Sequence, residues 1–198
     1  MSATARLPQA DLSGPFGRLA GASARRMLGD DEPTALGVMW HSPAMLRHTS
    51  MFGRKAKKKW RHAPPDLKAL AHMASAATIG CSMCLDFGYY QAQHEVDIDK
   101  ARQVPRWRSS TVFTPLERRV LAYAEAMCQT PPTVTDEMVA ELLEELGAPA
   151  VLELTAWIGF ANMTARTGVT LGLESHGLSA RCGLPPLAEP DRREVGSA

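Results

Sequence analysis

Two cysteines stand three positions apart in the stretch Ile79-Gly80-Cys81-Ser82-Met83-Cys84-Leu85-Asp86-Phe87-Gly88. This spacing places both sulfur atoms within one turn of a helix. Backbone N–H groups and the helix dipole stabilise an anion at a helix N-terminus, so a cysteine there can have a lowered pKa, and its thiolate is the reactive form. The neighbouring cysteine is close enough to take up the oxidised sulfur as a disulfide. The stretch therefore predicts a redox dithiol.

A helix with small or apolar residues on two sides leads into this dithiol. Pro64-Pro65-Asp66 opens the helix, with Asp66 as its predicted N-cap, and Gly80 ends it. The two faces carry Leu67, Leu70, Ala71, Ala74 and Ala77 on one side, and Ala69, His72, Met73 and Ala76 on the other. A helix that is apolar on both sides is usually packed on both sides, so we expect this one to be central.

Helical signals continue through the chain, and they predict the class of the fold. Further helices are expected over 33–50 with a division at Pro43, over 82–94, from Asp97 or Asp99 to about Val104, from Thr114-Pro115-Leu116-Glu117 to Pro131, from Thr135 to Gly147, and from Ala148 to about Thr170. No convincing strand alternation and no fixed-period repeat is present. We predict an all-α, single-domain helical bundle of about seven helices.

Length and composition suit one domain with tails. The chain has 198 residues, of which 45% are hydrophobic and 22% charged, which is enough for a packed core. We expect an N-terminal arm over 1–32, the helical domain over 33–183, and a mobile C-terminal tail over 184–198, which is rich in proline and charge.

Charge and targeting signals argue against several classes of partner. The net charge is +1, so no global field favours nucleic acid or anionic lipid. The basic run 54–62 has two interpretations: a site for an anion or nucleic acid, or a solvated loop that caps a helix end, and we favour the loop because no nucleic-acid-binding fold signature accompanies it. No apolar run approaches a membrane span, and the start has no signal-peptide pattern. With only four cysteines, at 81, 84, 128 and 182, we expect a cytoplasmic protein with reduced resting thiols.

The order of these motifs resembles that of the carboxymuconolactone decarboxylase and alkyl hydroperoxidase D-like family over about residues 35–180. The resemblance rests on the helix Leu67–Thr78 that leads into Gly80-Cys81-Ser82-Met83-Cys84. It continues in Thr114-Pro115-Leu116-Glu117-Arg118, Pro131-Pro132-Thr133-Val134-Thr135, Leu152-Glu153-Leu154-Thr155-Ala156 and Asn162-Met163-Thr164-Ala165-Arg166. A thioredoxin fold would instead place strands around the motif.

The resemblance implies an all-α fold that assembles into trimers or larger homo-oligomers. In the peroxidase branch of the family, the second cysteine attacks a hydroperoxide and the first resolves the sulfenic acid as a disulfide. A dithiol reductant protein or a small thiol then reduces the enzyme. The resemblance therefore makes Cys84 the attacking residue and Cys81 the resolving one. Helix electrostatics alone would favour Cys81, which is nearer the helix start.

The chain departs from the family pattern at the proton relay. The family's glutamate, twelve residues before the first cysteine, falls on Ala69, and its histidine, four residues after the second cysteine, falls on Gly88. Loss of a general base costs about 10²–10⁴ in rate. Our hypothesis is that His72, one turn after Ala69, takes over as the base, with or without Asp86. The alternative is that His72 is only a packed side chain.

Three functions remain open at this point. The first is a thiol-dependent oxidoreductase that reduces hydrogen peroxide or organic hydroperoxides. The second is a non-catalytic, redox-sensing helical oligomer that has lost the relay. The third, a carboxymuconolactone-type decarboxylase, has no use for two cysteines. We expect no cofactor and no metal, because zinc needs more ligands than Cys81 and Cys84 supply. Cys128 is interpreted as structural and Cys182 as a free surface thiol.

Overall fold

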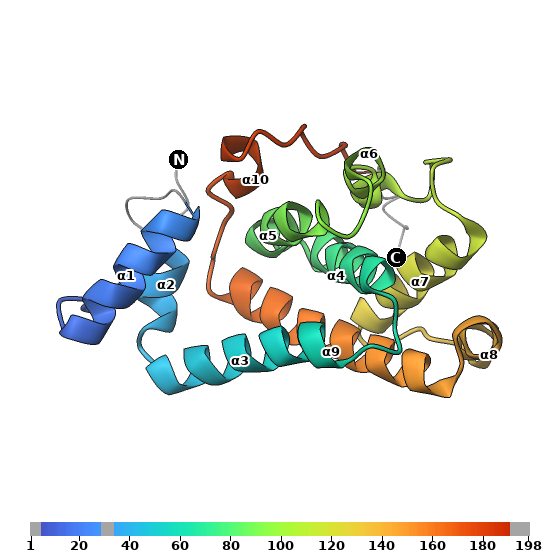
Figure 1. Ribbon diagram of the computed structural model, residues 1–198, viewed down its shortest axis with the longest axis horizontal. Coiled ribbons are helices and arrows are strands. Elements are labelled where there is room, and N and C mark those ends of the chain that lie inside the picture. The colour runs from blue at the N-terminus through green and yellow to red at the C-terminus, as the bar shows by residue number, and fades with distance from the viewer. Residues whose placement is uncertain (1–4, 29–33, 191–198) are drawn as a thin grey trace.

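The computed structural model describes residues 5–28 and 34–190, which form helices joined by turns and contain no strand (Figure 1). The helices of these residues are α1 (Pro15–Leu28), α2 (Thr34–Met39), α3 (Pro43–Lys59), α4 (Pro65–Ile79), α5 (Ser82–Ala92), α6 (Ile98–Ala101), the 3₁₀ helix η1 (Val104–Arg106), α7 (Pro115–Cys128), α8 (Asp136–Leu146), α9 (Ala148–Thr170) and α10 (Leu178–Arg181). The predicted all-α class is confirmed. The described residues contain more helices than the predicted seven or so, because α1 and α10 form in segments for which no full helix was predicted and the predicted helix ending near Val104 is divided into α6 and η1.

Helix α4 is the centre of the domain, as its two apolar faces predict. It packs against α5, α7 and α9, which surround it in Figure 1. Leu70, Met73 and Ala74 are among its fully or almost fully buried side chains. Gly80 ends α4 with a φ of 84°, a left-handed conformation that glycine adopts without a steric penalty. The chain can therefore turn directly from α4 into α5.

Most of the predicted helix starts are confirmed. The side chain of Thr114 caps α7 and Glu117 completes a capping box; Asp97 caps α6 and Thr135 caps α8. The predicted N-cap Asp66 is wrong. Pro65 takes the first helical position and Asp66 lies in the first turn, without a side-chain cap. The fixed φ of proline suits that first position, so the N-cap is Pro64 and the helix begins two residues earlier than predicted.

The basic run does not form the predicted loop. Residues 54–59 are the last turns of α3, and only the residues after Lys59 leave the helix. Lysine and arginine are good helix formers, and positive side chains in a last turn complement the helix dipole. The division at Pro43 is confirmed, since α2 ends at Met39 and α3 begins at Pro43.

Both ends of the described chain touch the helical domain. Arg6 N–H donates to the Leu171 carbonyl over 2.9 Å. At the other end, the Tyr89 hydroxyl donates to the Pro185 carbonyl over 2.9 Å, and Leu184 and Leu187 pack against the core. Residues 191–198 lie outside the described part, so the mobile tail and the domain boundaries stay predictions. Within the described ranges, no helix is both long and apolar enough to cross a membrane.

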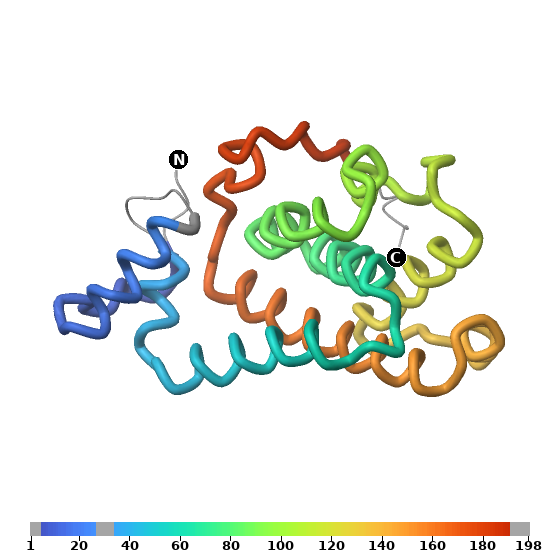
Figure 2. The backbone as a smooth tube through the Cα atoms, viewed as in Figure 1, coloured from blue at the N-terminus to red at the C-terminus, as the bar shows by residue number. Residues whose placement is uncertain are grey.

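Helices α3 and α9 lie side by side along one edge of the molecule (Figure 2). The rings of Phe52 on α3 and Phe160 on α9 have centroids 5.0 Å apart. A β-carbon on Gly53 would lie 3.1 Å from the Phe160 ring. Ala56 is the one buried residue of α3. Helix α3 therefore lies on the outside of the domain, next to the longest helix.

Candidate functional site

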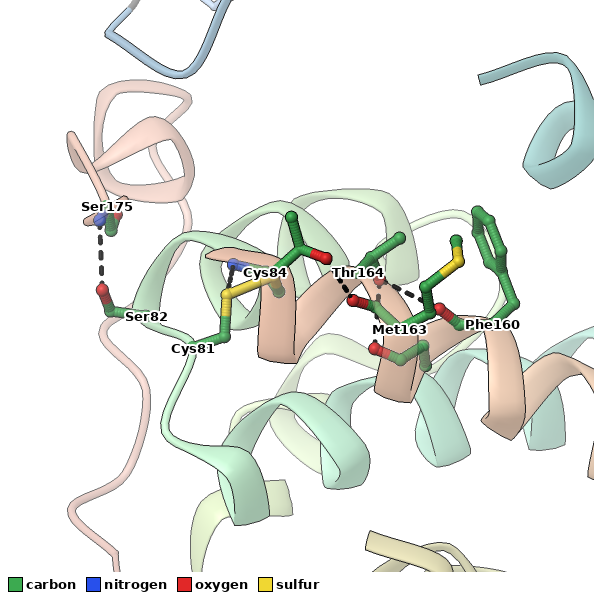
Figure 3. Close-up of a disulfide and its surroundings, with 9 residues drawn as sticks. Cys81, Ser82, Cys84, Phe160, Met163, Thr164 and Ser175 are labelled. Carbon is green, nitrogen blue, oxygen red and sulfur yellow. Dashed lines mark hydrogen bonds between the residues drawn. A yellow bond between two sulfur atoms is a disulfide. The ribbon is translucent and has the colours of Figure 1, made fainter. Parts of the chain in front are cut away.

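Cys81 and Cys84 form a disulfide at the start of α5 (Figure 3). Cys81 is the N-cap of the helix, and its sulfur accepts the backbone N–H of Cys84 over 3.2 Å. The turn after Gly80 thus brings the two sulfurs together at the end of the helix where N–H groups are unpaired. If Cys81 were a thiolate, its sulfur would accept a hydrogen bond directly from the Cys84 N–H, which is the stabilisation that helix electrostatics predict.

The disulfide lies in an apolar environment between α4, α5 and α9. Ala76 and Ala165 are buried with it, and Ile79, Met83 and Leu85 pack around it. Cys81 is 1% exposed and Cys84 is 7% exposed, so both residues are buried and Cys84 is the slightly more exposed of the two. This order of accessibility agrees with the role of attacking residue that the family resemblance implies for Cys84.

A glycine on α9 allows this close packing. A β-carbon on Gly168 would lie 3.0 Å from Cys81 Sγ and 3.6 Å from Cys84 Sγ. The first distance is shorter than ordinary van der Waals contact, so a side chain here would press on the disulfide. Sequence reasoning did not find Gly168, because it lies far from the cysteines along the chain.

His72 lies on α4 with its ring against Gly88 of α5. A β-carbon on residue 88 would lie 2.8 Å from His72 Cδ2 and 3.4 Å from Nε2. The imidazole therefore occupies space that a side chain at position 88 would need. Position 88 is where the family pattern places its relay histidine. The chain thus has an imidazole beside this position, but it comes from the neighbouring helix.

Burial decides the charge of this imidazole. Burial lowers the pKa of His72 to about 4, the charge of Lys57 acts in the same direction, and the Cys84 backbone, as a hydrogen-bond partner, raises it. The side chain as a whole is half-buried, but Nδ1 is fully covered and has no hydrogen-bond partner among the described residues. His72 is therefore neutral at neutral pH, with one ring nitrogen unused.

We expect Gly88→Ala to destabilise the fold by about 1–3 kcal/mol, although alanine is the better helix former. The added methyl group would overlap the His72 ring, and Trp157, whose ring centroid is 6.0 Å away, restricts how the ring can move. Urea denaturation would measure this loss. The matched control is Gly159→Ala, because a β-carbon on Gly159 has no atom within 4 Å. Equal stability of the two variants would contradict the predicted clash.

Asp86, the residue that the relay hypothesis pairs with His72, has its carboxylate bound by the segment that follows α9. Its carboxylate accepts hydrogen bonds from the Ser175 hydroxyl over 2.5 Å, from Leu178 N–H over 2.7 Å, and from both the N–H and the hydroxyl of Ser179. Burial raises the pKa of Asp86, but the bonds from these residues outweigh it and hold the pKa below its usual range. Asp86 therefore anchors the chain between α9 and α10 to α5.

We expect Asp86→Asn to cost about 2–4 kcal/mol of unfolding free energy at neutral pH. An amide cannot accept from all these donors, and hydrogen bonds to a buried charge are worth more than neutral ones. Since folding lowers the Asp86 pKa, the wild type loses this contribution as pH falls, so the difference between the proteins should shrink in acid. Urea denaturation at neutral and acid pH would measure it. A variant as stable as the wild type at neutral pH would refute the anchor.

The remaining cysteines lie apart from the disulfide. Cys128 is buried, and its sulfur accepts from Asn162 Nδ2 over 3.2 Å; Cys182 is exposed. Burial raises the pKa of Cys128, so its thiol is protonated at neutral pH. Both placements agree with the structural and surface roles predicted for these residues.

Comparison with known proteins identifies the family. The model of the carboxymuconolactone decarboxylase family matches residues 43–126, which include both cysteines and His72. An uncharacterized protein of Escherichia coli K12, YnjA, is 33% identical over 144 residues, or 72% of this chain and 78% of that protein. The chain belongs to the carboxymuconolactone decarboxylase family. The resemblance drawn from the sequence is therefore confirmed.

Solved structures of similar fold include proteins related to peroxidases and a debrominase. An uncharacterized peroxidase-related protein from Ralstonia eutropha JMP134, with an alkylhydroperoxidase D core, superposes with a TM-score of 0.69 at 18% identity; the match covers 88% of this chain and 94% of that one. The debrominase Bmp8, in a cysteine-to-alanine variant bound to 2,3,4-tribromopyrrole, gives a TM-score of 0.71 at 20% identity, covering 91% and 95%. At these identities the likeness establishes a shared fold.

Proposed function

We propose that this member of the carboxymuconolactone decarboxylase family is a thiol-dependent oxidoreductase that reduces hydrogen peroxide or organic hydroperoxides at Cys81 and Cys84. The observation that carries the proposal is the disulfide between these residues at the N-terminus of α5. Two sulfurs that bond across one helical turn can take up and release two electrons without a change of fold. The apolar residues around them suit an organic hydroperoxide.

The chemistry proceeds in three steps. The Cys84 thiolate attacks the terminal oxygen of the hydroperoxide, the O–O bond breaks, and the leaving alkoxide takes a proton to become an alcohol. Cys84 is then a sulfenic acid. The Cys81 thiol attacks that sulfur and expels water, which forms the disulfide. A dithiol reductant, either a protein or a small thiol, returns both cysteines to thiols and is itself oxidised to a disulfide.

His72 is the residue that we propose as the base in place of the missing relay. Its ring lies against Gly88 of α5, the helix that carries Cys84. The unused Nδ1 gives it capacity to accept a proton. A pKa of about 4 keeps this nitrogen free of a proton at neutral pH, but it also makes the imidazole a weak base. Thiolate formation assisted by His72 would therefore be slower than thiolate formation assisted by a base whose pKa lies near neutral pH.

A redox-sensing oligomer is the second candidate. Burial of both sulfurs and the low basicity of His72 favour slow oxidation, which is sufficient for a sensor but not for a scavenger. Assembly into a homo-oligomer is part of both proposals. The two candidates differ in the rate of disulfide formation and in whether a reductant sustains turnover.

The test is the rate at which stoichiometric peroxide oxidises the reduced protein. Stopped-flow tryptophan fluorescence would follow the reaction in a Cys182→Ser background, and peptide mass spectrometry would map the disulfide. A free small-molecule dithiol at the same pH is the reference. We expect oxidation orders of magnitude faster than the reference, and turnover when a dithiol reductant is added. Oxidation no faster than the reference would rule out the peroxidase and leave the sensor.

A bromopyrrole should be tested as a second oxidant, because the debrominase Bmp8 shares the fold. Reductive debromination would use the same two electrons: the dithiol becomes a disulfide, the C–Br bond is replaced by C–H, and bromide leaves. Disulfide formation with release of bromide, without reaction toward peroxides, would move the proposal from hydroperoxides to halogenated aromatic rings.

A further inference from the structure

The positive and negative charges of this chain are separated along the sequence, although they almost cancel in sum. Residues 1–62 contain eleven lysines and arginines and four acids, whereas residues 63–198 contain eleven and seventeen. In Figure 1, α1, α2 and the start of α3 lie at one end of the long axis, and the acidic helix α8 lies at the other. The net charge of the whole chain, which argued against anionic partners, therefore hides a strongly basic N-terminal part.

Helix α3 carries a row of positive charges on the face that points away from the domain. Residues 41–65 contain no acid. Arg47, Arg54 and Lys58 follow one another at spacings of seven and four residues, so they share one face, and this face is opposite the buried Ala56. All three side chains are exposed and have no hydrogen-bond or ion-pair partner among the described residues. The basic row of Arg47, Arg54 and Lys58 therefore attracts an anionic surface.

Large apolar side chains are exposed near this basic row. On α3, Met45 and Phe52 are each 43% exposed. Helix α1, which carries three arginines and no acid, leaves Phe16 80% exposed and Leu19 69% exposed. A nucleic acid is bound mainly through its phosphates and would leave these apolar side chains in water. Exposed apolar residues among lysines and arginines are instead typical of a segment that lies on an anionic membrane.

An apolar groove opens beside the basic row, where α2 meets α3. It has a volume of about 430 Å³ and is lined by Trp40, Pro43, Ala44, Leu46, Arg47 and Ser50. Arg47 is the only charged residue of this lining, so its guanidinium belongs both to the groove and to the basic row. An occupant with an apolar chain and an anionic group fits these two features, and a phospholipid has both.

We propose that α3 docks on an anionic phospholipid surface, with the basic row against the headgroups and an acyl chain in the groove beside Arg47. Each cation of the row contributes a modest attraction to the anionic surface, and the exposed apolar side chains add the burial that holds a peripheral protein at the interface. This arrangement needs no membrane-crossing helix, and the described part of the chain contains none.

Helix α3 also lies beside the helix that covers the dithiol. Phe52 on α3 contacts Phe160 on α9, and Phe160, Thr164 and Gly168 then follow at spacings of four residues along one face of α9 to the disulfide (Figure 3). Docking through α3 would hold the dithiol near the lipid, so a hydroperoxide on an acyl chain is the organic substrate that the surface would supply. This choice of substrate, unlike the docking itself, rests on the proposed function.

Co-sedimentation with lipid vesicles tests the docking. We expect binding to vesicles of phosphatidylglycerol and phosphatidylcholine in equal amounts, and binding that is at least about tenfold weaker to phosphatidylcholine alone. Replacing the whole basic row, by Arg47→Gln, Arg54→Gln and Lys58→Gln together, should weaken binding to the anionic vesicles about a hundredfold. Circular dichroism would verify that the variant is folded.

The matched control is a second triple variant, Arg106→Gln, Arg108→Gln and Arg181→Gln. These arginines are also exposed, and their loss changes the net charge by the same amount, but they lie outside α1, α2 and α3. We expect this variant to bind the anionic vesicles as the wild type does, to within about threefold, because salt screens distant charges. Equal weakening by the two triple variants, or equal binding to charged and neutral vesicles, would overturn the proposal.

A double variant, Leu19→Gln with Met45→Gln, separates a lipid surface from a soluble polyanion. Because both side chains would be buried in the lipid interface, we expect about tenfold weaker binding to the anionic vesicles. Binding of heparin or duplex DNA as tight as the binding of vesicles, with no effect of the two apolar substitutions, would overturn the proposal in favour of a nucleic acid or another polyanion.

Peroxide turnover distinguishes a failure of the docking from a failure of the proposed function. The variant without the basic row should reduce tert-butyl hydroperoxide, which is soluble in water, at the wild-type rate. It should reduce a phosphatidylcholine hydroperoxide in anionic vesicles about tenfold more slowly than the wild type, or slower still. A wild type that binds vesicles but reduces neither hydroperoxide would refute the proposed function and leave the docking in place. Reduction of both hydroperoxides without vesicle binding would refute the docking alone.

Discussion

Cys84→Ser is expected to lower peroxide turnover to the background of the reaction without enzyme, a loss of about 10³-fold or more. The substitution removes the sulfur that we propose as the nucleophile, and a serine hydroxyl is not ionised at neutral pH. Peroxide consumption with a dithiol reductant, measured in the Cys182→Ser background, is the readout. The buried Cys128 stays in place, because its pKa is raised and its thiol is inert in this comparison.

Cys81→Ser is the matched control, and it separates attack from resolution. We expect this variant to react once with peroxide and to accumulate a sulfenic acid on Cys84, which a dimedone adduct would reveal by mass spectrometry. The reverse pattern, with the adduct on Cys81 in Cys84→Ser, would assign the attack to Cys81. The position of Cys81 as N-cap would then outweigh the greater exposure of Cys84.

His72→Gln is expected to slow disulfide formation about a hundredfold, the lower end of the effect of a general base. Glutamine is similar in volume and can form hydrogen bonds, but it does not take up a proton. The low end applies because a pKa of about 4 makes His72 a weak base at neutral pH. Stopped-flow oxidation of the reduced protein by stoichiometric peroxide gives the rate. An unchanged rate of disulfide formation would mean that His72 is only a packed side chain.

The pH dependence of the unfolding free energy of His72→Gln provides a second test, because it reports whether the protein keeps the pKa of His72 low. The folded state holds the His72 pKa at about 4, while the unfolded chain titrates near 6.5. The unfolded state therefore binds the proton first, and the wild type loses up to about 3 kcal/mol as pH falls from 6.5 to 4. The unfolding free energy of His72→Gln should not fall in this way as the pH is lowered. His48→Gln, which changes an exposed residue, should lose stability in acid as the wild type does.

Local chemistry was sufficient to predict most of the helices and the proximity of Cys81 to Cys84. Thr114 and Thr135 cap their helices through bonds to residues three positions ahead, and Gly80 takes a conformation that glycine adopts easily. Because Cys81 and Cys84 are three positions apart, their sulfurs can meet across one helical turn. All these relations span a few residues, so backbone geometry decides them before the chain packs.

The local prediction failed at two places, the start of α4 and the basic run 54–62, for two different reasons. Asp66 has the residue type of an N-cap, but the two prolines before it shift the helix start to Pro65. The basic run 54–62 has a composition typical of a surface loop, and the helix nonetheless continues to Lys59. Lysine and arginine suit both states, so composition alone could not separate them.

Tertiary structure alone decided how distant residues meet at the site. The sequence shows that Ala69 and Gly88 lack the relay groups, but only the packing of α4 on α5 places the His72 ring in the space beside Gly88. In the same way, Asp86 reaches Ser175 and Ser179, and Gly168 reaches the disulfide, across more than 80 residues of chain. Such contacts depend on how whole helices pack, which no local pattern of residues encodes.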